Sequence, residues 1–168
     1  ASILNDSNVF KPPFIKTLPN RNTDIERLFK KDNIKPNIIY ALPFTSVIDQ
    51  NYDVLSEIIK ENTGDFAESD KLLKFHSVTP IVYKDFEGYD ARFFFENWQS
   101  KILSTTFVQL LNTIFKVGDS SIVNRFHRLA NSIIILDEVQ VIDEKYYLIV
   151  REFLQILSKE YNCYIILV

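Results

Sequence analysis

The stretch Asn131–Gln140, NSIIILDEVQ, decides the fold class of this chain. Its apolar residues, from Ile133 to Leu136, run directly into two adjacent carboxylates, Asp137 and Glu138. A short β-branched run bounded by polar residues predicts a strand that is buried on both faces, as in a parallel sheet. In open α/β sheets, chemistry gathers where such strands end at their carboxyl side.

The two carboxylates at the end of this strand are the first candidate site. Two ionised carboxylates side by side repel each other and resist burial unless a cation or a catalytic role retains them. They fit the acidic box of a nucleoside triphosphatase, in which Asp137 holds Mg²⁺ and Glu138 orients or activates the attacking water. The simpler interpretation is that a buried strand gives way here to a solvated loop, and these residues alone leave both interpretations open.

Length and composition fit a single domain with a hydrophobic core, because the chain has 168 residues, of which 46% are hydrophobic and 24% charged. The net charge of −3 gives no global basic field of the kind typical of nucleic-acid binding, although a groove can be basic on an acidic protein. The single cysteine, Cys163, excludes an internal disulfide and fits a cytoplasmic protein with a buried, inert thiol. No apolar run reaches membrane-spanning length, so we expect no membrane partner.

The hydrophobic pattern predicts strands that alternate with helices, which implies a mostly parallel sheet with helices on both faces. The expected strands are Asn37–Leu42, Leu72–Val78, Ile102–Thr105, the strand before Asp137, and Cys163–Val168. Helices with one apolar stripe are expected to begin near Thr45, Thr106, Ser120 and Asp143. The segment Thr79–Asn97, rich in acidic and aromatic residues, gives no clear prediction.

The chain has only three glycines, and none lies in a GxxxxGK[ST] or GxGxxG arrangement. The phosphate-cradling loop that a nucleoside triphosphatase needs is therefore absent from these residues. Residues 1–31 read instead as an irregular, proline-bearing lead-in with a short helix at Thr23–Lys31, where Thr23 is the expected cap. The final buried strand runs to Val168 without a following loop, and we interpret the chain as a piece of a longer protein.

Several segments together resemble the helicase module of the type I CRISPR-associated helicase-nuclease, a superfamily 2 helicase of the DEAD/DEAH-like kind. Ile38–Leu55 (IIYALPFTSVIDQNYDVL) looks like the family's Ia region, and Phe75–Ser77 (FHS) stands where a family HS element lies. Glu96–Phe115 resembles the family's ENW-to-TTFVQ segment, and NSIIILDEVQ takes the acidic-box position. The resemblance runs in order over most of the chain, and the combination is far more specific than any single motif.

The resemblance implies that residues 32–168 are a partial first RecA-like P-loop NTPase domain of an ATP-dependent single-strand DNA translocase or helicase. Its role would be CRISPR interference, an antiviral defence, with ATP and Mg²⁺ as cofactors. The implied partners are single-stranded DNA, the CRISPR effector complex and an HD nuclease domain, in the same chain or a separate one. The implied location is the cytoplasm.

Several family features are missing from the residues given. The glycine-rich loop should lie before Asn37, and it is either absent or left out of the sequence near Asn22–Lys31. The motif after the last strand and the second RecA-like domain with its arginine finger would follow Val168. Only His76 and His127 occur, with no His-Asp pair at metal-ligand spacing, so we expect no nuclease activity. We expect these residues alone to be inactive as an ATPase.

Five positions carry the expected catalytic and nucleotide roles or the family's main DNA contact. Glu138 and Asp137 are the expected catalytic residues, and Asp137 is expected to hold Mg²⁺ through water. Gln140 is a candidate for sensing the nucleotide, against a solvated loop residue. Thr105 and Thr106 match the paired threonines that contact nucleic acid in the family, since hydroxyls and a helix N-terminus can hold a DNA phosphate. The alternative for the threonines is helix capping.

Further candidates for nucleic-acid contact have simpler alternatives. Ser46, beside Thr45 at the start of a helix, suits a phosphate contact or a helix cap. His76 and Ser77 are weaker candidates, because a lone histidine on an apolar segment is more often structural. Trp98 could stack a base, but a core anchor is the simpler interpretation.

A second class of function fits the same residues. A degenerate RecA-like module that binds nucleic acid or a protein without catalysis is the alternative, and a plain structural fragment is the third reading. A glycine-rich loop encoded upstream of Asn37 and a second helicase domain encoded downstream of Val168 would favour the enzyme. Their absence from the gene would favour the binding module.

Overall fold

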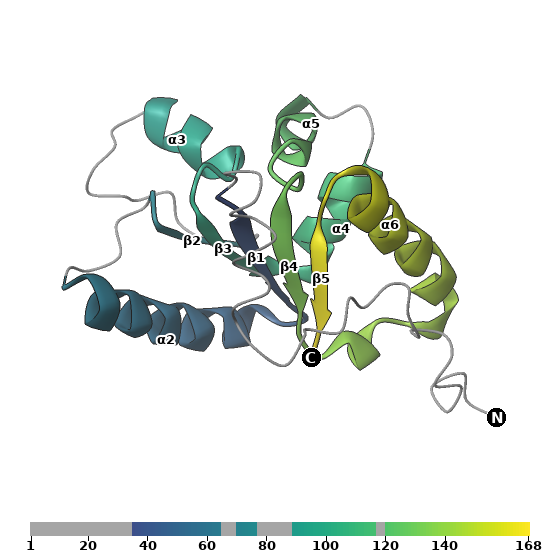
Figure 1. Ribbon diagram of the computed structural model, residues 1–168, viewed down its shortest axis with the longest axis horizontal. Helices are drawn as coiled ribbons and strands as arrows, with labels where there is room; N and C mark the ends of the chain where they lie inside the picture. The colour runs from purple at the N-terminus through teal and green to yellow at the C-terminus, as the bar shows by residue number, and fades with distance from the viewer. Residues whose placement is uncertain (1–34, 65–69, 77–88, 117–119) are drawn as a thin grey trace.

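The computed structural model describes residues 35–64, 70–76, 89–116 and 120–168, and these form one sheet flanked by helices (Figure 1). The five strands are all parallel, in the order β2-β3-β1-β4-β5. Their bounds are β1 Asn37–Leu42, β2 Leu72–Phe75, β3 Ile102–Thr106, β4 Ser132–Leu136 and β5 Tyr164–Leu167. The helices are α2 Thr45–Thr63, α3 Tyr89–Glu96, α4 Phe107–Phe115, α5 Ser120–Phe126 and α6 Tyr147–Glu160, with short 3₁₀ turns η2 Val139–Val141 and η3 Glu144–Tyr146. The predicted α/β fold with a parallel sheet is confirmed, and it is consistent with a RecA-like domain.

Side chains alternate along each strand, so the sheet has two faces. On one face, residues such as Ile134 and Leu103 join α3, α4 and α6 in the main hydrophobic core. The other face meets α2, which packs on β1, β2 and β3. Lys74 marks this second face, because it binds Asp49 of α2 at 2.7 Å while its neighbour Leu73 belongs to the main core. Helices therefore cover both faces, as the pattern predicted.

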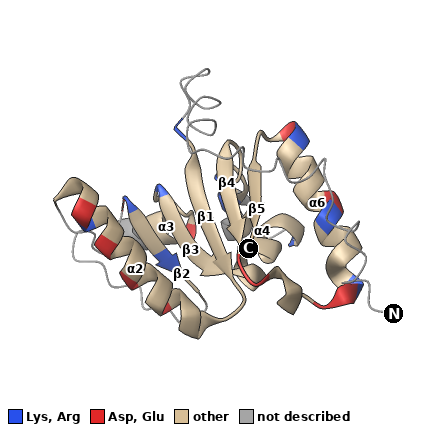
Figure 2. Ribbon diagram, turned by 60° about the horizontal axis from the view of Figure 1, so that its bottom comes forward, with Lys and Arg blue, Asp and Glu red and all other residues tan. Residues whose placement is uncertain are grey.

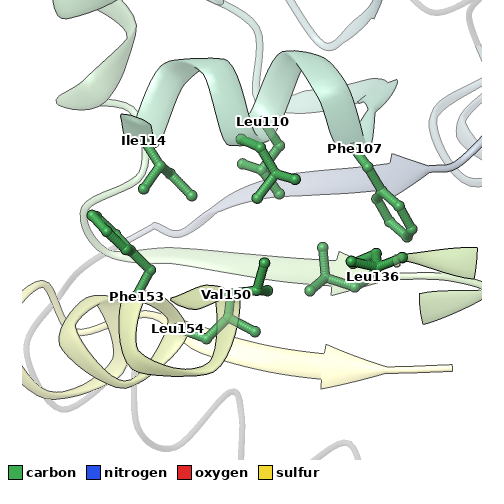
Figure 3. A pocket seen from close by; sticks show the side chains of 9 residues that line it. Phe107, Leu110, Ile114, Leu136, Val150, Phe153 and Leu154 are labelled. Carbon is green, nitrogen blue, oxygen red and sulfur yellow. The ribbon is translucent and has the colours of Figure 1, made fainter. Parts of the chain in front are cut away.

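The layer made by α4 and α6 is wholly apolar where the two helices meet over β4 (Figure 3). Its lining residues come from three elements: Phe107, Leu110, Leu111 and Ile114 of α4, Leu136 at the end of β4, and Ile142, Val150, Phe153 and Leu154 in and before α6. Ligand sites combine an apolar lining with a few polar groups that orient the ligand. This crevice has no such group, so we treat it as part of the core.

Two arginines at or just after the end of α5 anchor the turn that precedes β3 and the first residue of β1. Arg128 donates hydrogen bonds to the Trp98 carbonyl at 2.9 Å and to Asn37 Oδ1 at 3.1 Å. The buried Arg125 guanidinium lies 5.5 Å from the centre of the Trp98 ring. Trp98 is only 1% exposed, which confirms the core-anchor interpretation over base stacking.

Some predicted boundaries were wrong. Asp143 begins only the 3₁₀ turn η3, whose cap it forms, and α6 starts at Tyr147. The segment that gave no prediction, Thr79–Asn97, contains α3. The lead-in, including the predicted helix at Thr23–Lys31, lies outside the described residues. None of the helices described here has the length and apolarity that crossing a membrane requires.

Candidate active site

The acidic pair lies at the carboxyl edge of the sheet, between the ends of β1 and β5. The Asp137 amide donates to the Ala41 carbonyl at 3.1 Å, and the Glu138 amide donates to the Val168 carbonyl at 3.2 Å. These bonds extend the ladder of β4 by one step on each side, which fixes where the two side chains leave the backbone. Figure 2 shows this acidic segment beside the carboxyl end of β5.

The Asp137 carboxylate is half-buried and already has one protein partner. Its Oδ2 accepts a hydrogen bond from the Tyr40 hydroxyl at 2.8 Å. Tyr40 lies in the middle of β1, opposite Ile135 of β4, so its side chain points to the same face as Asp137 and reaches along it. Burial, followed by the contact with Asp137, raises the pKa of Tyr40 to about 12. The phenol therefore remains a hydrogen-bond donor throughout the neutral pH range.

Glu138 differs from Asp137 in both backbone and exposure. Its φ of 57° lies in the left-handed region, which is uncommon for a residue with a side chain. Such conformations cost free energy and cluster at functional sites. The Glu138 side chain is exposed, and its carboxylate accepts a hydrogen bond from the Gln140 amide in η2. The structure therefore brings Glu138 and Gln140 together at the solvent side of Asp137.

The donor set fits a magnesium ion shared with a nucleotide and does not fit a metal cage made only of protein. Within the described ranges, no three His, Cys, Asp or Glu side chains gather closely enough to hold a metal. Magnesium in nucleotide sites is held by one or two carboxylates, by substrate phosphates and by water. Asp137, with Oδ2 bound to Tyr40, has Oδ1 left for such an ion or for a water on it.

The threonine pair lies at the same edge of the sheet, on β3. Thr105 is fully buried, and its hydroxyl donates to the Phe75 carbonyl of β2 at 2.8 Å. Thr106 caps α4, because its Oγ accepts from the Gln109 amide at 3.2 Å. A hydroxyl has one proton to donate, so Thr105 has used its donor in the sheet while Thr106, as an acceptor, keeps its own.

Two of the remaining predicted contacts, Ser46 and His76, lie at the same edge. Ser46 is exposed in the first turn of α2, whose cap position is Phe44 and carries no side-chain hydrogen bond. Thr45 and Ser46 are therefore inside the helix and do not cap it. His76 is buried just after β2, and burial lowers its pKa, which favours the neutral imidazole. Ser77 lies outside the described residues.

The prediction of a buried, inert thiol is confirmed. Cys163 is fully buried, its sulfur donates to the Leu129 carbonyl at 2.8 Å, and burial raises its pKa, so it is an inert core thiol. His127 is exposed on the surface near α5.

The sequence analysis missed Tyr40 and Asn51. Asn51 lies on α2, and its side chain hydrogen-bonds the Tyr40 hydroxyl. The three residues Asn51, Tyr40 and Asp137 therefore form a hydrogen-bonded series that ends at the Asp137 carboxylate. The available signal was a single hydroxyl-bearing residue inside the otherwise apolar run NIIYAL. That signal is weak, because Tyr40 and Asp137 are 97 residues apart and their pairing depends on strand order and register.

One curated protein with significant similarity is the CRISPR-associated nuclease/helicase Cas3 of Haloferax volcanii. It is 28% identical to this chain over 141 residues, which are 77% of this chain and 15% of that protein. This chain thus spans a small part of the relative's length. No protein-family model matches. The comparison supports a relationship to a Cas3-type helicase, in agreement with the ordered motifs of the sequence.

Proposed function

We propose that this chain is the nucleotide-handling part of an ATP-driven, single-strand DNA translocase or helicase that acts in CRISPR interference. The observation that carries the proposal is the acidic pair, with Asp137 held at the carboxyl end of β4 and Glu138 exposed next to it. Both the ordered motifs and the similarity to a protein named as a nuclease/helicase support the same assignment.

In this proposal the two carboxylates have separate tasks. Asp137 holds Mg²⁺, through water, by its free Oδ1, and the ion would neutralise charge on the ATP phosphates. Glu138 accepts a proton from the attacking water or orients it, and its exposure gives it the necessary access. Gln140 donates a hydrogen bond to the Glu138 carboxylate and would sense the nucleotide through it.

DNA would cross the same edge of the sheet. Thr106 offers a hydroxyl proton and the first turn of α4, and Ser46 offers an exposed hydroxyl in the first turn of α2. Helix N-termini and hydroxyls bind phosphate without reading base identity, as a translocase requires. Thr105, His76 and Ser77 remain proposed members of this path, with Thr105 supporting it from within the sheet.

The alternative is a degenerate RecA-like module that binds nucleic acid or a protein without hydrolysing ATP. The absence of any GxxxxGK[ST] run from these 168 residues favours it. A binding module does not need the paired carboxylates at the end of β4, and it has no reason to keep Glu138 in a strained backbone conformation.

The deciding experiment measures DNA-stimulated ATP hydrolysis in two proteins, the full-length gene product and the purified 168-residue chain. The full-length product should hydrolyse ATP in the presence of Mg²⁺ and single-stranded DNA. The 168-residue chain should show negligible turnover, because it lacks a loop to cradle the phosphates. Full-length protein that binds DNA but never hydrolyses ATP would establish the binding module.

A further inference from the structure

A polar chain crosses the sheet face from α2 to the acidic pair. Its members are Asn51 on α2, Tyr40 on β1 and Asp137 at the end of β4. The Tyr40 hydroxyl donates to Asp137 Oδ2 at 2.8 Å and accepts a hydrogen bond from the Asn51 side chain. The hydrogen bonds of this polar chain therefore all run in one direction, from the Asn51 amide to the Tyr40 phenol and from the phenol to the Asp137 carboxylate.

The backbone at Asp137 leaves the orientation of its carboxylate open. The Asp137 amide is bound to the Ala41 carbonyl, which fixes the main chain but not the side-chain torsions. The hydroxyl of Tyr40 restrains them, because its hydrogen bond holds Oδ2 and leaves Oδ1 without a bond to the phenol. Carboxylates that hold a metal are commonly oriented by such an outer hydrogen bond, and its loss typically weakens metal binding or activity by about 10- to 100-fold.

Tyr40 is itself held at both ends. Its backbone belongs to a strand that pairs with β3 on one side and β4 on the other, which fixes where the side chain leaves the sheet. Asn51, half-buried in α2, hydrogen-bonds the Tyr40 hydroxyl with its side chain.

We propose that Tyr40 is a positioning residue for Asp137, that Asn51 acts through Tyr40, and that α2 thereby sets the orientation of the metal-holding carboxylate. The inference rests on the proposed role of Asp137 with Mg²⁺. Because α2 also begins with the exposed Ser46, the same helix carries a residue proposed to contact DNA and a residue that acts on the proposed nucleotide site.

The test measures the affinity of the full-length protein for a fluorescent ATP analogue, once with Mg²⁺ and once with EDTA. The ratio of the two affinities reports the contribution of the metal alone. Tyr40→Phe should lower this ratio about ten-fold and leave the affinity in EDTA unchanged. Asn51→Ala should lower it by a smaller factor, about three-fold, because Tyr40 keeps its bond to Asp137.

Two further variants make the result specific. The double variant Tyr40→Phe with Asn51→Ala should be no worse than Tyr40→Phe alone, since Asn51 acts only through the phenol. Tyr52→Phe is the matched control, because it removes another half-buried phenol, on α2, whose ring contacts Lys74, and it should leave the ratio unchanged. Thermal unfolding of each variant checks that the fold is intact.

Asp137→Asn separates the two levels of the proposal. If Asp137→Asn abolishes the magnesium effect and Tyr40→Phe does not change it, the positioning role is wrong and the proposed function stands. If Asp137→Asn leaves the ratio as in the wild type, both are wrong. Equal losses with Mg²⁺ and with EDTA in Tyr40→Phe would show general damage and overturn the inference. Should Tyr40→Phe fail to fold, Asn51→Ala decides, and a wild-type ratio in that variant overturns it.

Discussion

The acidic end of β4 and the threonine end of β3 look alike in sequence, yet the fold treats them differently. Both place two adjacent polar residues where a parallel strand ends. At β4, Asp137 keeps one carboxylate oxygen uncommitted and Glu138 is exposed. At β3, Thr105 is buried and its hydroxyl donates a hydrogen bond to a carbonyl of β2. The Thr106 hydroxyl oxygen accepts a hydrogen bond as the cap of α4.

The difference has a physical origin in charge. A neutral hydroxyl can satisfy a neighbouring carbonyl inside the sheet, so burying Thr105 costs little once the bond to Phe75 forms. An ionised carboxylate has no proton to donate to a carbonyl inside the sheet. Burying two such carboxylates together would be costly without a cation. The acidic pair is therefore driven to the solvent side of the edge, where a metal and a nucleotide can reach it.

The largest effect expected from this comparison is at Glu138. In the full-length protein, Glu138→Gln should lower ATP turnover by about 100-fold or more while nucleotide affinity stays close to that of the wild type, because a neutral amide cannot take the proton of water. Asp137→Ala should instead weaken Mg²⁺-dependent nucleotide binding. Turnover assays and nucleotide titrations measure both. Glu144→Gln, an exposed acid in η3, is the control. Wild-type turnover in Glu138→Gln would remove the acidic-box assignment.

The next effect concerns stability at Thr105. Replacing Thr105 with Val keeps the β-branched shape and removes the hydroxyl, which leaves the buried Phe75 carbonyl without this donor. We expect a loss of about 1–3 kcal/mol in the free energy of unfolding. Urea denaturation of the 168-residue chain measures it, with Thr105→Ser as the control that keeps the hydroxyl. If the Val variant is as stable as the wild type, the hydrogen bond to β2 contributes nothing to stability. The ends of β4 and β3 then differ less than the structure suggests.

A smaller effect is expected for DNA at Thr106. Thr106→Val removes a hydroxyl whose proton is not used in capping α4, so single-strand binding by the full-length protein should weaken about three- to ten-fold. The loss should be similar for unrelated oligonucleotides, and the salt dependence should hardly move because no cation is deleted. Fluorescence anisotropy with two sequences at several salt concentrations tests this, and Thr106→Ser should bind like the wild type.

Thr105→Val separates a phosphate contact from a structural role. Its hydroxyl is committed to β2, so it should change DNA affinity far less than Thr106→Val does. Unchanged binding in Thr106→Val would mean that this residue is only a helix cap and that the DNA path lies elsewhere.

How much of this could be predicted from sequence depends on the range of the interaction. β1 was predicted at its observed bounds, and the carboxylates of Asp137 and Glu138 were placed at a strand end, because both follow from local patterns of apolar and polar residues. The partner of Asp137 could not be predicted, since Tyr40 meets it only through the pairing of β1 with β4. The fate of the Thr105 proton likewise depends on β2 lying next to β3, which no local pattern encodes.

The smallest effect, and the sharpest check on the acidic edge, is the titration of Tyr40. Its pKa is raised from the ordinary value of 10.0 to about 12, first by burial and then by Asp137. Below pH 10 the phenol is protonated in both the folded and the unfolded chain, and its contribution to stability is fully present. Between pH 10 and 12 the unfolded chain releases the proton first, so this contribution is lost as pH rises. The difference in ultraviolet absorbance between wild type and Tyr40→Phe should therefore titrate near pH 12. Asp137→Asn should move that midpoint down without restoring 10, because burial is the larger cause. An unchanged midpoint in Asp137→Asn would mean that Tyr40 does not hold Asp137, and the distinction between the ends of β4 and β3 would then rest on exposure alone.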